Sequence, residues 1–301
     1  MTKEDFSKLV NKAMANNDLA SMRPVVEKEL LHYEIFHALD QAGLLRSLVF
    51  QGGTSLRLCR GSDRFSEDLV FAGGRDFSAQ SMKKISGCVE SRIGARFGLN
   101  VKVTEPKPPK EGAQVTVAKW MISIETTAGN PSIPRQKIKL EIANIPAYTS
   151  EAVPLRANYE SVAAGSTVLV NTESIDEVLA DKTVALPTSI SKKQDGKLIH
   201  TPTRVRYRDI WDIAWLISRG AKLDARMVND KILDYGIENY EALLDFAAKQ
   251  MPILVAGDSF KAQMRRFIAK QAYEKRFGTG YEAYFVSSVN DQFRDMKTQL
   301  T

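Results

Sequence analysis

The spacing of apolar residues changes along the chain, from a period of two in the first half to a period near 3.6 after about residue 170. Residues 136–144 alternate charged side chains with isoleucine and leucine, a pattern that predicts a half-buried strand. Residues 115–125 also indicate a strand, and the segment 126–134 between the two has turn chemistry. We therefore expect an antiparallel pair here.

Glycine and proline delimit the other elements of the first half. A long helix is expected over 24–42, because a proline lies in its first turn and a glycine follows its end. A short buried strand is expected at 48–50. The three prolines of 105–112 predict an exposed loop.

The second half is predicted to be helical. Ser174 and Glu177 form a capping box at the start of a helix expected to end near Leu186. Further helices are expected over 207–218, 239–250, 258–276 and 281–298. The chain is thus predicted to be an α+β protein, with a β-containing domain over 1–168 and a helical domain over 169–301.

Composition narrows the class of protein. The 301 residues are 44% hydrophobic and 26% charged, which is typical of a globular chain and excludes a disordered or collagen-like one. Two cysteines and three histidines exclude a disulfide framework and a thiolate zinc site. There is no signal-peptide pattern, and no apolar stretch approaches the ~20 residues of a membrane span. We expect a cytoplasmic protein with no membrane partner.

The charge balance permits an anionic partner without requiring one. The 42 Lys and Arg against 36 Asp and Glu give a net charge of +6. Basic residues gather at 204–208 and at 265–276, where Tyr273 stands among them, as on a surface that follows RNA phosphates. The alternative is an ordinary solvated helix face.

Residues Gly52, Gly53, Thr54 and Ser55 stand between an apolar strand and a resumed helical pattern. Glycines let a backbone approach a ligand closely, and amides at a helix N-terminus attract phosphate. The two hydroxyls add hydrogen-bond donors. The segment is therefore a candidate phosphate site, and the alternative is a tight turn with an N-cap.

Two carboxylates are candidate metal ligands. If residues 64–71 form a strand, Ser66, Asp68 and Val70 share one face. Glu141 lies on the charged face of its own strand, and opposite Asp68 it would complete a magnesium site, because Mg²⁺ prefers carboxylate and phosphate oxygens. The alternative for both is a solvated surface charge.

Charged residues also interrupt two apolar helices. Lys182 stands on an apolar stripe, where an isolated buried charge is costly. Asp209 and Asp212 share a face of a helix that is apolar nearly all round, so Asp212 in particular must be paired. Lys182 can contact a ligand or snorkel to solvent. A purely structural ion pair, either Lys182–Asp209 or Arg208–Asp212, is the other alternative.

Five segments in order carry a family resemblance: GGTSLRL, RFSEDLVF, KIKLEI, EVLADKTVAL and RYRDIWDI. They resemble the motifs of the AbiEii-like nucleotidyltransferase toxins of type IV toxin–antitoxin and abortive-infection (phage-defence) systems. The resemblance extends from the helix EKELLHYEIFHAL to about Leu216. It implies a DNA polymerase β-like core with a mixed sheet, followed by a helical C-terminal domain. It also implies transfer of a nucleoside monophosphate from an NTP, with Mg²⁺ as cofactor.

The resemblance further implies roles for single residues. Asp68 would be the first carboxylate of the family's Asp-x-Asp pair and, with Glu141, would bind Mg²⁺. Lys182 would contact the nucleotide phosphates, Asp209 would complete the site, and Asp212 would orient it. The helical domain would thus contribute Lys182 and Asp209. The expected nucleotide-binding residues are Gly52, Gly53, Thr54, Ser55, Ser66 and Lys182, and the expected supporting residues are Arg57, Arg64, Arg208 and Asp212.

One position departs from the family pattern, since Val70 stands where the second aspartate is expected. Valine offers no metal ligand, and Glu67 cannot replace it because adjacent strand residues face opposite ways. We expect the loss to reduce metal-dependent transfer by about two orders of magnitude. Either the chain is a natural pseudoenzyme, or Val70 is a loss-of-toxicity substitution. The retention of Lys182 and Asp209 favours the second.

The acceptor implied by the resemblance is RNA, and tRNA above all, because nucleotides added to its acceptor end would block aminoacylation. A cognate antitoxin encoded nearby is also implied, acting without a stable direct complex. Two alternatives stay open. One is a nucleotidyltransferase that acts on a protein or a small molecule, and the other is a non-catalytic nucleotide-binding regulatory module.

Overall fold

The computed structural model describes residues 4–15, 17–19, 21–109, 111–127, 134–163 and 167–300. The chain divides into two compact units, Met1–Thr172 (the first unit) and Glu173–Thr301 (the second unit). Residues 169–172, which the sequence pattern placed with the helical half, form a strand of the first unit.

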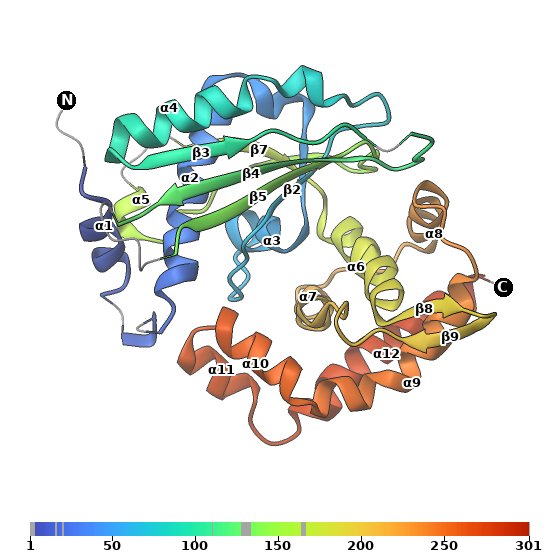
Figure 1. Ribbon diagram of the computed structural model, residues 1–301. Coiled ribbons are helices and arrows are strands. Elements are labelled where there is room, and N and C mark those ends of the chain that lie inside the picture. Colours follow the sequence, from blue (N-terminus) through green and yellow to red (C-terminus); the bar gives the residue numbers. More distant parts are fainter. Residues whose placement is uncertain are drawn as a thin grey trace. The chain divides into compact units, whose positions relative to one another are not determined.

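A mixed seven-stranded sheet organises the first unit (Figure 1). The strand order is β3-β4-β5-β2-β1-β7-β6. Strand β2 runs parallel to β5 and β1 parallel to β7, whereas the other neighbours are antiparallel. The strands are β1 (Val49–Gln51), β2 (Leu69–Ala72), β3 (Asn100–Thr104), β4 (Val117–Glu125), β5 (Gln136–Ala143), β6 (Glu151–Pro154) and β7 (Leu169–Thr172).

The expected antiparallel pair is confirmed as β4 and β5, in continuous register from Val117↔Ala143 to Ile124↔Gln136. Residues 128–133 of the expected turn lie outside the described residues. The expected loop at 105–112 has no helix or strand among its described residues.

The apolar face of the sheet packs on helices α2 (Arg23–Gln41) and α4 (Ile85–Phe97), which also contact each other. The ring of Phe36 in α2 lies 4.9 Å from that of Phe50 and 6.0 Å from that of Phe71. Because side chains alternate along a strand, this packing leaves the charged face of β5 on the opposite side. The remaining helices and turns are α1 (Phe6–Ala13), η1 (Asn17–Leu19), η2 (Leu44–Ser47), α3 (Gly52–Arg60), η3 (Ala79–Met82) and α5 (Glu160–Ala163).

Helices make up most of the second unit, which confirms the α+β class. None of the helices in the described ranges is long and apolar enough to cross a membrane. The elements are α6 (Ile175–Ile190), β8 (Ser191–Gln194), β9 (Lys197–His200), α7 (Tyr207–Ser218), α8 (Ala225–Asp234), α9 (Tyr240–Ala256), α10 (Asp258–Phe267), α11 (Lys270–Arg276) and α12 (Tyr281–Leu300).

Several features of the second unit differ from the sequence pattern. Helix α8 was not expected at all. The single helix expected over 258–276 is broken at Ile268, which is buried and extended (φ −127°, ψ 133°). Helix α6 begins at its capping box, with Ser174 accepting from the Glu177 amide at 3.2 Å, but continues through Pro187. The β8–β9 hairpin was not expected, although its Asp-Gly turn has the positive φ angles that favour a tight hairpin turn.

Candidate functional site

The turn from β1 into α3 requires a glycine. Gly52 has a φ of +77°, a left-handed conformation that L side chains rarely adopt. A Cβ there would meet nothing within 4 Å, so the requirement comes from the backbone alone. The first amides of α3 have no acceptor within the helix and can bind an anion.

The hydroxyls beside this turn hold the chain in place. Thr54 Oγ1 donates to the backbone carbonyl of Asp68, and Ser55 Oγ donates to the carbonyl of Gly52 at 2.8 Å. Both residues are buried, as is Ser66. Thr54 therefore joins the glycine turn to the segment that carries Asp68, and the amides are the groups of this turn best suited to phosphate.

Strands β2 and β5 bring Asp68 and Glu141 to the same face of the sheet. Val70 is in register with Glu141, and Asp68 lies just before β2. The two carboxylates, which we call the sheet pair, are half-buried, with 29% and 22% of their side chains exposed. Lys139 Nζ lies 3.3 Å from Asp68, and Lys119 Nζ lies 2.7 Å from Glu141. Sequence reasoning did not anticipate these two lysine partners.

The sheet pair suits one magnesium ion better than two. In proteins, Mg²⁺ is held by one or two carboxylates together with substrate phosphates and water. Asp68 and Glu141 can provide the two carboxylates. A second ion needs further ligands, and Val70, beside Glu141, supplies none. Across the described ranges, no cluster of three or more His, Cys, Asp or Glu residues could hold a metal ion.

The second unit contains a buried group of opposite charges. Lys182 Nζ donates to Asp209 Oδ1 at 2.5 Å and lies 3.1 Å from Asp212 Oδ2. All three residues, which we call the buried triad, are less than 9% exposed. Asp209 Oδ2 has no hydrogen-bond partner among the described residues, and Arg206 Nη1 lies 3.9 Å from it. Lys182 is therefore held by two carboxylates rather than snorkelling to solvent.

The arginines named from sequence have structural partners. Arg57 forms a two-point ion pair with Glu29 (2.9 and 3.1 Å) and lies over the ring of Phe65. Burial alone would lower the pKa of Arg57, but the Glu29 carboxylate raises it above its usual value. Arg64 is buried and donates to the carbonyl of Phe65, and the Arg208 guanidinium lies over another phenylalanine ring.

A second buried charge cluster escaped sequence reasoning. Lys231 Nζ lies 2.7 Å from Asp181, 2.9 Å from Glu177 and 3.8 Å from Glu173. Burial, and then the charge of Asp181, raise the pKa of Glu173 well above its usual value. Glu177 and Asp181 lie four residues apart on one face of α6, and Glu173 lies four residues before Glu177, so this spacing was the available signal.

Comparison with known proteins assigns the chain to a family. The sequence profile of the family described as "Nucleotidyl transferase AbiEii toxin, Type IV TA system" matches residues 35–284. No curated protein matches the chain.

Two solved structures share the fold. One is JHP933 from Helicobacter pylori, with a TM-score of 0.51, 19% identity, and coverage of 92% of this chain and 93% of that one. The other is MenT4, a nucleotidyltransferase toxin from Mycobacterium tuberculosis, with a TM-score of 0.51, 15% identity and coverage of 99% of both chains. The expected nucleotidyltransferase fold is thus confirmed.

Proposed function

Because the chain belongs to the family of AbiEii nucleotidyltransferase toxins of type IV toxin–antitoxin systems, we propose that it transfers a nucleoside monophosphate from an NTP to RNA, with tRNA as the acceptor. Membership of this family also implies a cognate antitoxin. The observation that carries the proposal is the set of groups found within each unit: a glycine turn and the sheet pair in the first unit, and the buried triad in the second.

We propose that the first unit holds the triphosphate and Mg²⁺. The amides after Gly52 would bind phosphate oxygens, and Thr54 fixes Asp68 next to that turn through its carbonyl. Asp68 and Glu141 would hold Mg²⁺, which when bound neutralises charge on the triphosphate. Lys139 and Lys119, whose side chains are 43% and 50% exposed, can turn to solvent when the carboxylates bind a cation.

We propose that the buried triad supplies the remaining groups of the reaction. Lys182 would bind a phosphate oxygen of the nucleotide, and Asp212, which is fully buried, would orient it. Asp209 would complete the site through Oδ2, the oxygen for which the described part of the chain supplies no hydrogen-bond partner.

Val70 is proposed to limit this activity. By the resemblance, Val70 stands where the family pattern has the second aspartate, and its register with Glu141 puts an apolar side chain beside that carboxylate. One electrostatic stabiliser lost from a nucleotidyltransferase site reduces turnover by roughly 10²–10³-fold. The protein as it stands would then bind its nucleotide and turn it over slowly.

The choice of RNA rests on charge. Helices α10 and α11 carry Arg265, Arg266, Lys270, Lys275 and Arg276, and α11 has no buried residue. The Arg265 guanidinium lies 5.4 Å from the ring of Tyr273, an aromatic–cation pairing suited to a nucleic-acid surface. Binding of tRNA is therefore expected to weaken steeply as salt rises.

A transfer assay tests the proposal. The Val70→Asp protein is incubated with labelled NTPs and Mg²⁺, in separate reactions with tRNA, with protein and with small-molecule acceptors such as aminoglycosides. The proposal predicts label in the tRNA band and, at equal protein concentration, far less with the Val70 chain. Label found only in protein or only in small molecules would show that the acceptor is of that class and not tRNA.

A second candidate function is a non-catalytic nucleotide-binding module, and Val70 favours it because valine cannot bind a metal ion. That candidate predicts NTP binding without transfer to any acceptor, even in the Val70→Asp protein. Equilibrium dialysis with the same labelled NTPs, run beside the transfer assay, separates the two.

A further inference from the structure

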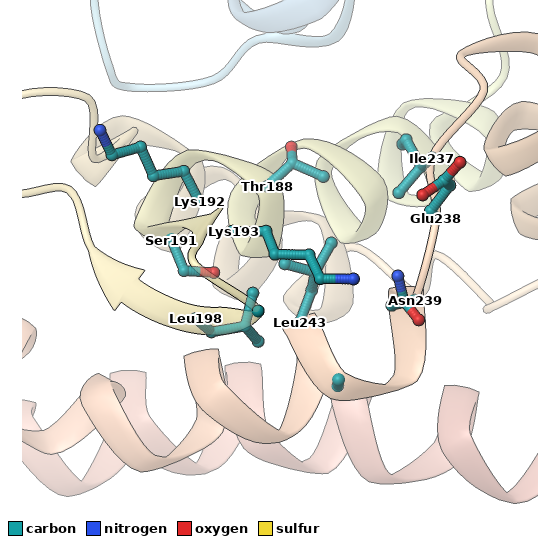
Figure 2. Close-up of a pocket in the computed structure, with 11 residues that line it drawn as sticks. Thr188, Ser191, Lys192, Lys193, Leu198, Ile237, Glu238, Asn239 and Leu243 are labelled. Carbon is teal, nitrogen blue, oxygen red and sulfur yellow. The ribbon is translucent and has the colours of Figure 1, made fainter.

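A cavity of about 380 Å³ opens in the second unit, between the β8–β9 hairpin and the start of α9 (Figure 2). Apolar side chains of Leu198, Ile237 and Leu243 line part of it. Polar groups come from the end of α6 and the start of β8 on one side and from residues just before α9 on the other. None of the residues assigned above to nucleotide transfer lines this cavity.

Ser191 places an unsatisfied hydroxyl in the cavity wall. The residue is 3% exposed, and its Oγ has no hydrogen-bond partner among the described residues. Figure 2 shows this oxygen directed toward the side where Lys193 and Leu198 lie. A buried hydroxyl without a partner costs free energy comparable to a lost hydrogen bond, so a ligand that accepts from it would be stabilised.

The N-terminus of α9 faces the same cavity without a side-chain cap. Asn239, at the N-cap position, has a left-handed backbone (φ 55°) and its side chain makes no capping bond. The first amide bonded within the helix is that of Leu243, which donates to the Asn239 carbonyl. The amides of residues 240–242 therefore have no helical acceptor, and Ala242 lines the cavity. Such a helix end favours an anion.

The hairpin adds a cation to this wall. Both lysines of the hairpin line the cavity, but the Lys193 side chain extends toward Asn239, whereas that of Lys192 runs in the opposite direction (Figure 2). This difference follows from the alternation of side chains along β8. Glu238 also lines the cavity, and its carboxylate is the one charge that opposes an anion there.

We propose that this cavity binds a phosphate group. The Lys193 ammonium, the Ser191 hydroxyl and the first amides of α9 are all donors, and they approach from different sides, which suits the several oxygens of phosphate better than the two of a carboxylate. The apolar wall would contact the sugar or base attached to the phosphate. The phosphate belongs either to a free nucleotide or to an RNA strand.

Binding is measured on the full chain by following backbone amide resonances while inorganic phosphate, AMP or a 5′-phosphorylated oligoribonucleotide is added. The expected result is a shift of the amides of residues 240–242 with all three probes. Lys193→Gln should weaken binding about tenfold and Ser191→Ala about threefold. Glu238→Gln should tighten it about threefold, because a repulsive charge is removed.

Lys192→Gln is the matched control, since it removes the same charge from the neighbouring residue. Its effect should stay below about twofold. If Lys193→Gln weakens the binding of AMP and of the oligoribonucleotide alike, the phosphate of a mononucleotide is sufficient for binding. If only the oligoribonucleotide is weakened, the phosphate is that of RNA, and both results support the site.

Equal losses in Lys192→Gln and Lys193→Gln would overturn the proposal, because they would indicate general charge attraction. Shifts confined to the amides near Gly52, with none at residues 240–242, would overturn it as well. The measurement reads binding and not transfer, so its failure leaves the proposed nucleotidyltransferase function standing.

Discussion

The sheet pair and the buried triad hold their charges in opposite ways. Asp68 and Glu141 are half-buried, and each contacts one lysine whose side chain is about half exposed. Lys182, by contrast, shares a buried space with Asp209 and Asp212, where water cannot replace a missing partner. Loss of a charged partner is therefore expected to cost little free energy of unfolding at the sheet pair and much more at the buried triad.

This difference explains how valine can stand at position 70. The residue is half-buried on the charged face of the sheet, so a valine there opens no cavity and leaves no buried charge unpaired. A change within the buried triad would instead destabilise the fold. Activity can thus be lost at the sheet pair while the protein stays folded.

The largest expected effect comes from Lys182→Met, which leaves two buried carboxylates without their ammonium. We expect the free energy of unfolding to fall by about 3 kcal/mol or more. Lys139→Met is the matched control, because it removes the same group from the exposed partner of Asp68, and it should cost less than about 1 kcal/mol. Urea denaturation followed by circular dichroism measures both. Equal losses of unfolding free energy in the two variants would contradict the proposed difference between the two regions.

A pH effect is expected next in size, at the buried His32 of α2. Burial lowers the pKa of His32 from 6.5 to about 4, and its Nε2 lies 3.0 Å from the carbonyl oxygen of Glu67, next to Asp68. The unfolded chain takes up a proton near pH 6.5 and the folded one near pH 4. The stabilisation is therefore complete above pH 6.5 and is lost as the pH falls toward 4.

Between pH 7 and pH 5 this linkage should lower the free energy of unfolding by about 2 kcal/mol. His32→Gln keeps a hydrogen-bond donor but does not titrate. Its free energy of unfolding, measured by urea denaturation, should therefore change between pH 7 and pH 5 by about 2 kcal/mol less than that of the wild-type chain. Glu173 in the second unit acts in the opposite direction, because its raised pKa means that stability is lost as the pH rises. A wild-type chain and a His32→Gln chain with identical pH profiles would refute the assignment.

The smallest effect is expected at the glycine turn that precedes the sheet pair. Gly52→Ala should cost about 1 kcal/mol, because alanine in a left-handed conformation is strained. Gly52→Asn should cost less, since asparagine tolerates that conformation better. Thermal denaturation of the two variants provides the measurement, and an asparagine variant no more stable than the alanine variant would argue against the backbone explanation.

Local patterns were sufficient for much of the fold. The alternation over 136–144 predicted which face of β5 is buried, and the capping box predicted where α6 begins. The rule that buried charge needs a partner gave a Lys182–Asp209 ion pair as one of the alternatives for Lys182, and the structure contains that pair. Each of these rests on neighbouring residues or on a general cost of burial.

Features that depend on long-range pairing were not predictable. The register of Val70 with Glu141 and the lysine partners of the sheet pair arise only once β2 joins β5 in parallel and β4 joins β5. Likewise, Lys231 is on a helix with an ordinary amphipathic sequence, and its three carboxylate partners come from another part of the chain. Tertiary packing decides such contacts.

We propose that one missing carboxylate limits turnover by this nucleotidyltransferase. The most direct measurement compares Mg²⁺-dependent transfer of labelled NTP to tRNA by the Val70, Val70→Asp and Val70→Asn proteins. We predict about 100-fold faster transfer by Val70→Asp than by the Val70 chain. Val70→Asn, nearly equal to aspartate in shape but uncharged, should recover little. Equal rates for all three proteins, or equal gains with Asp and Asn, would contradict the claim.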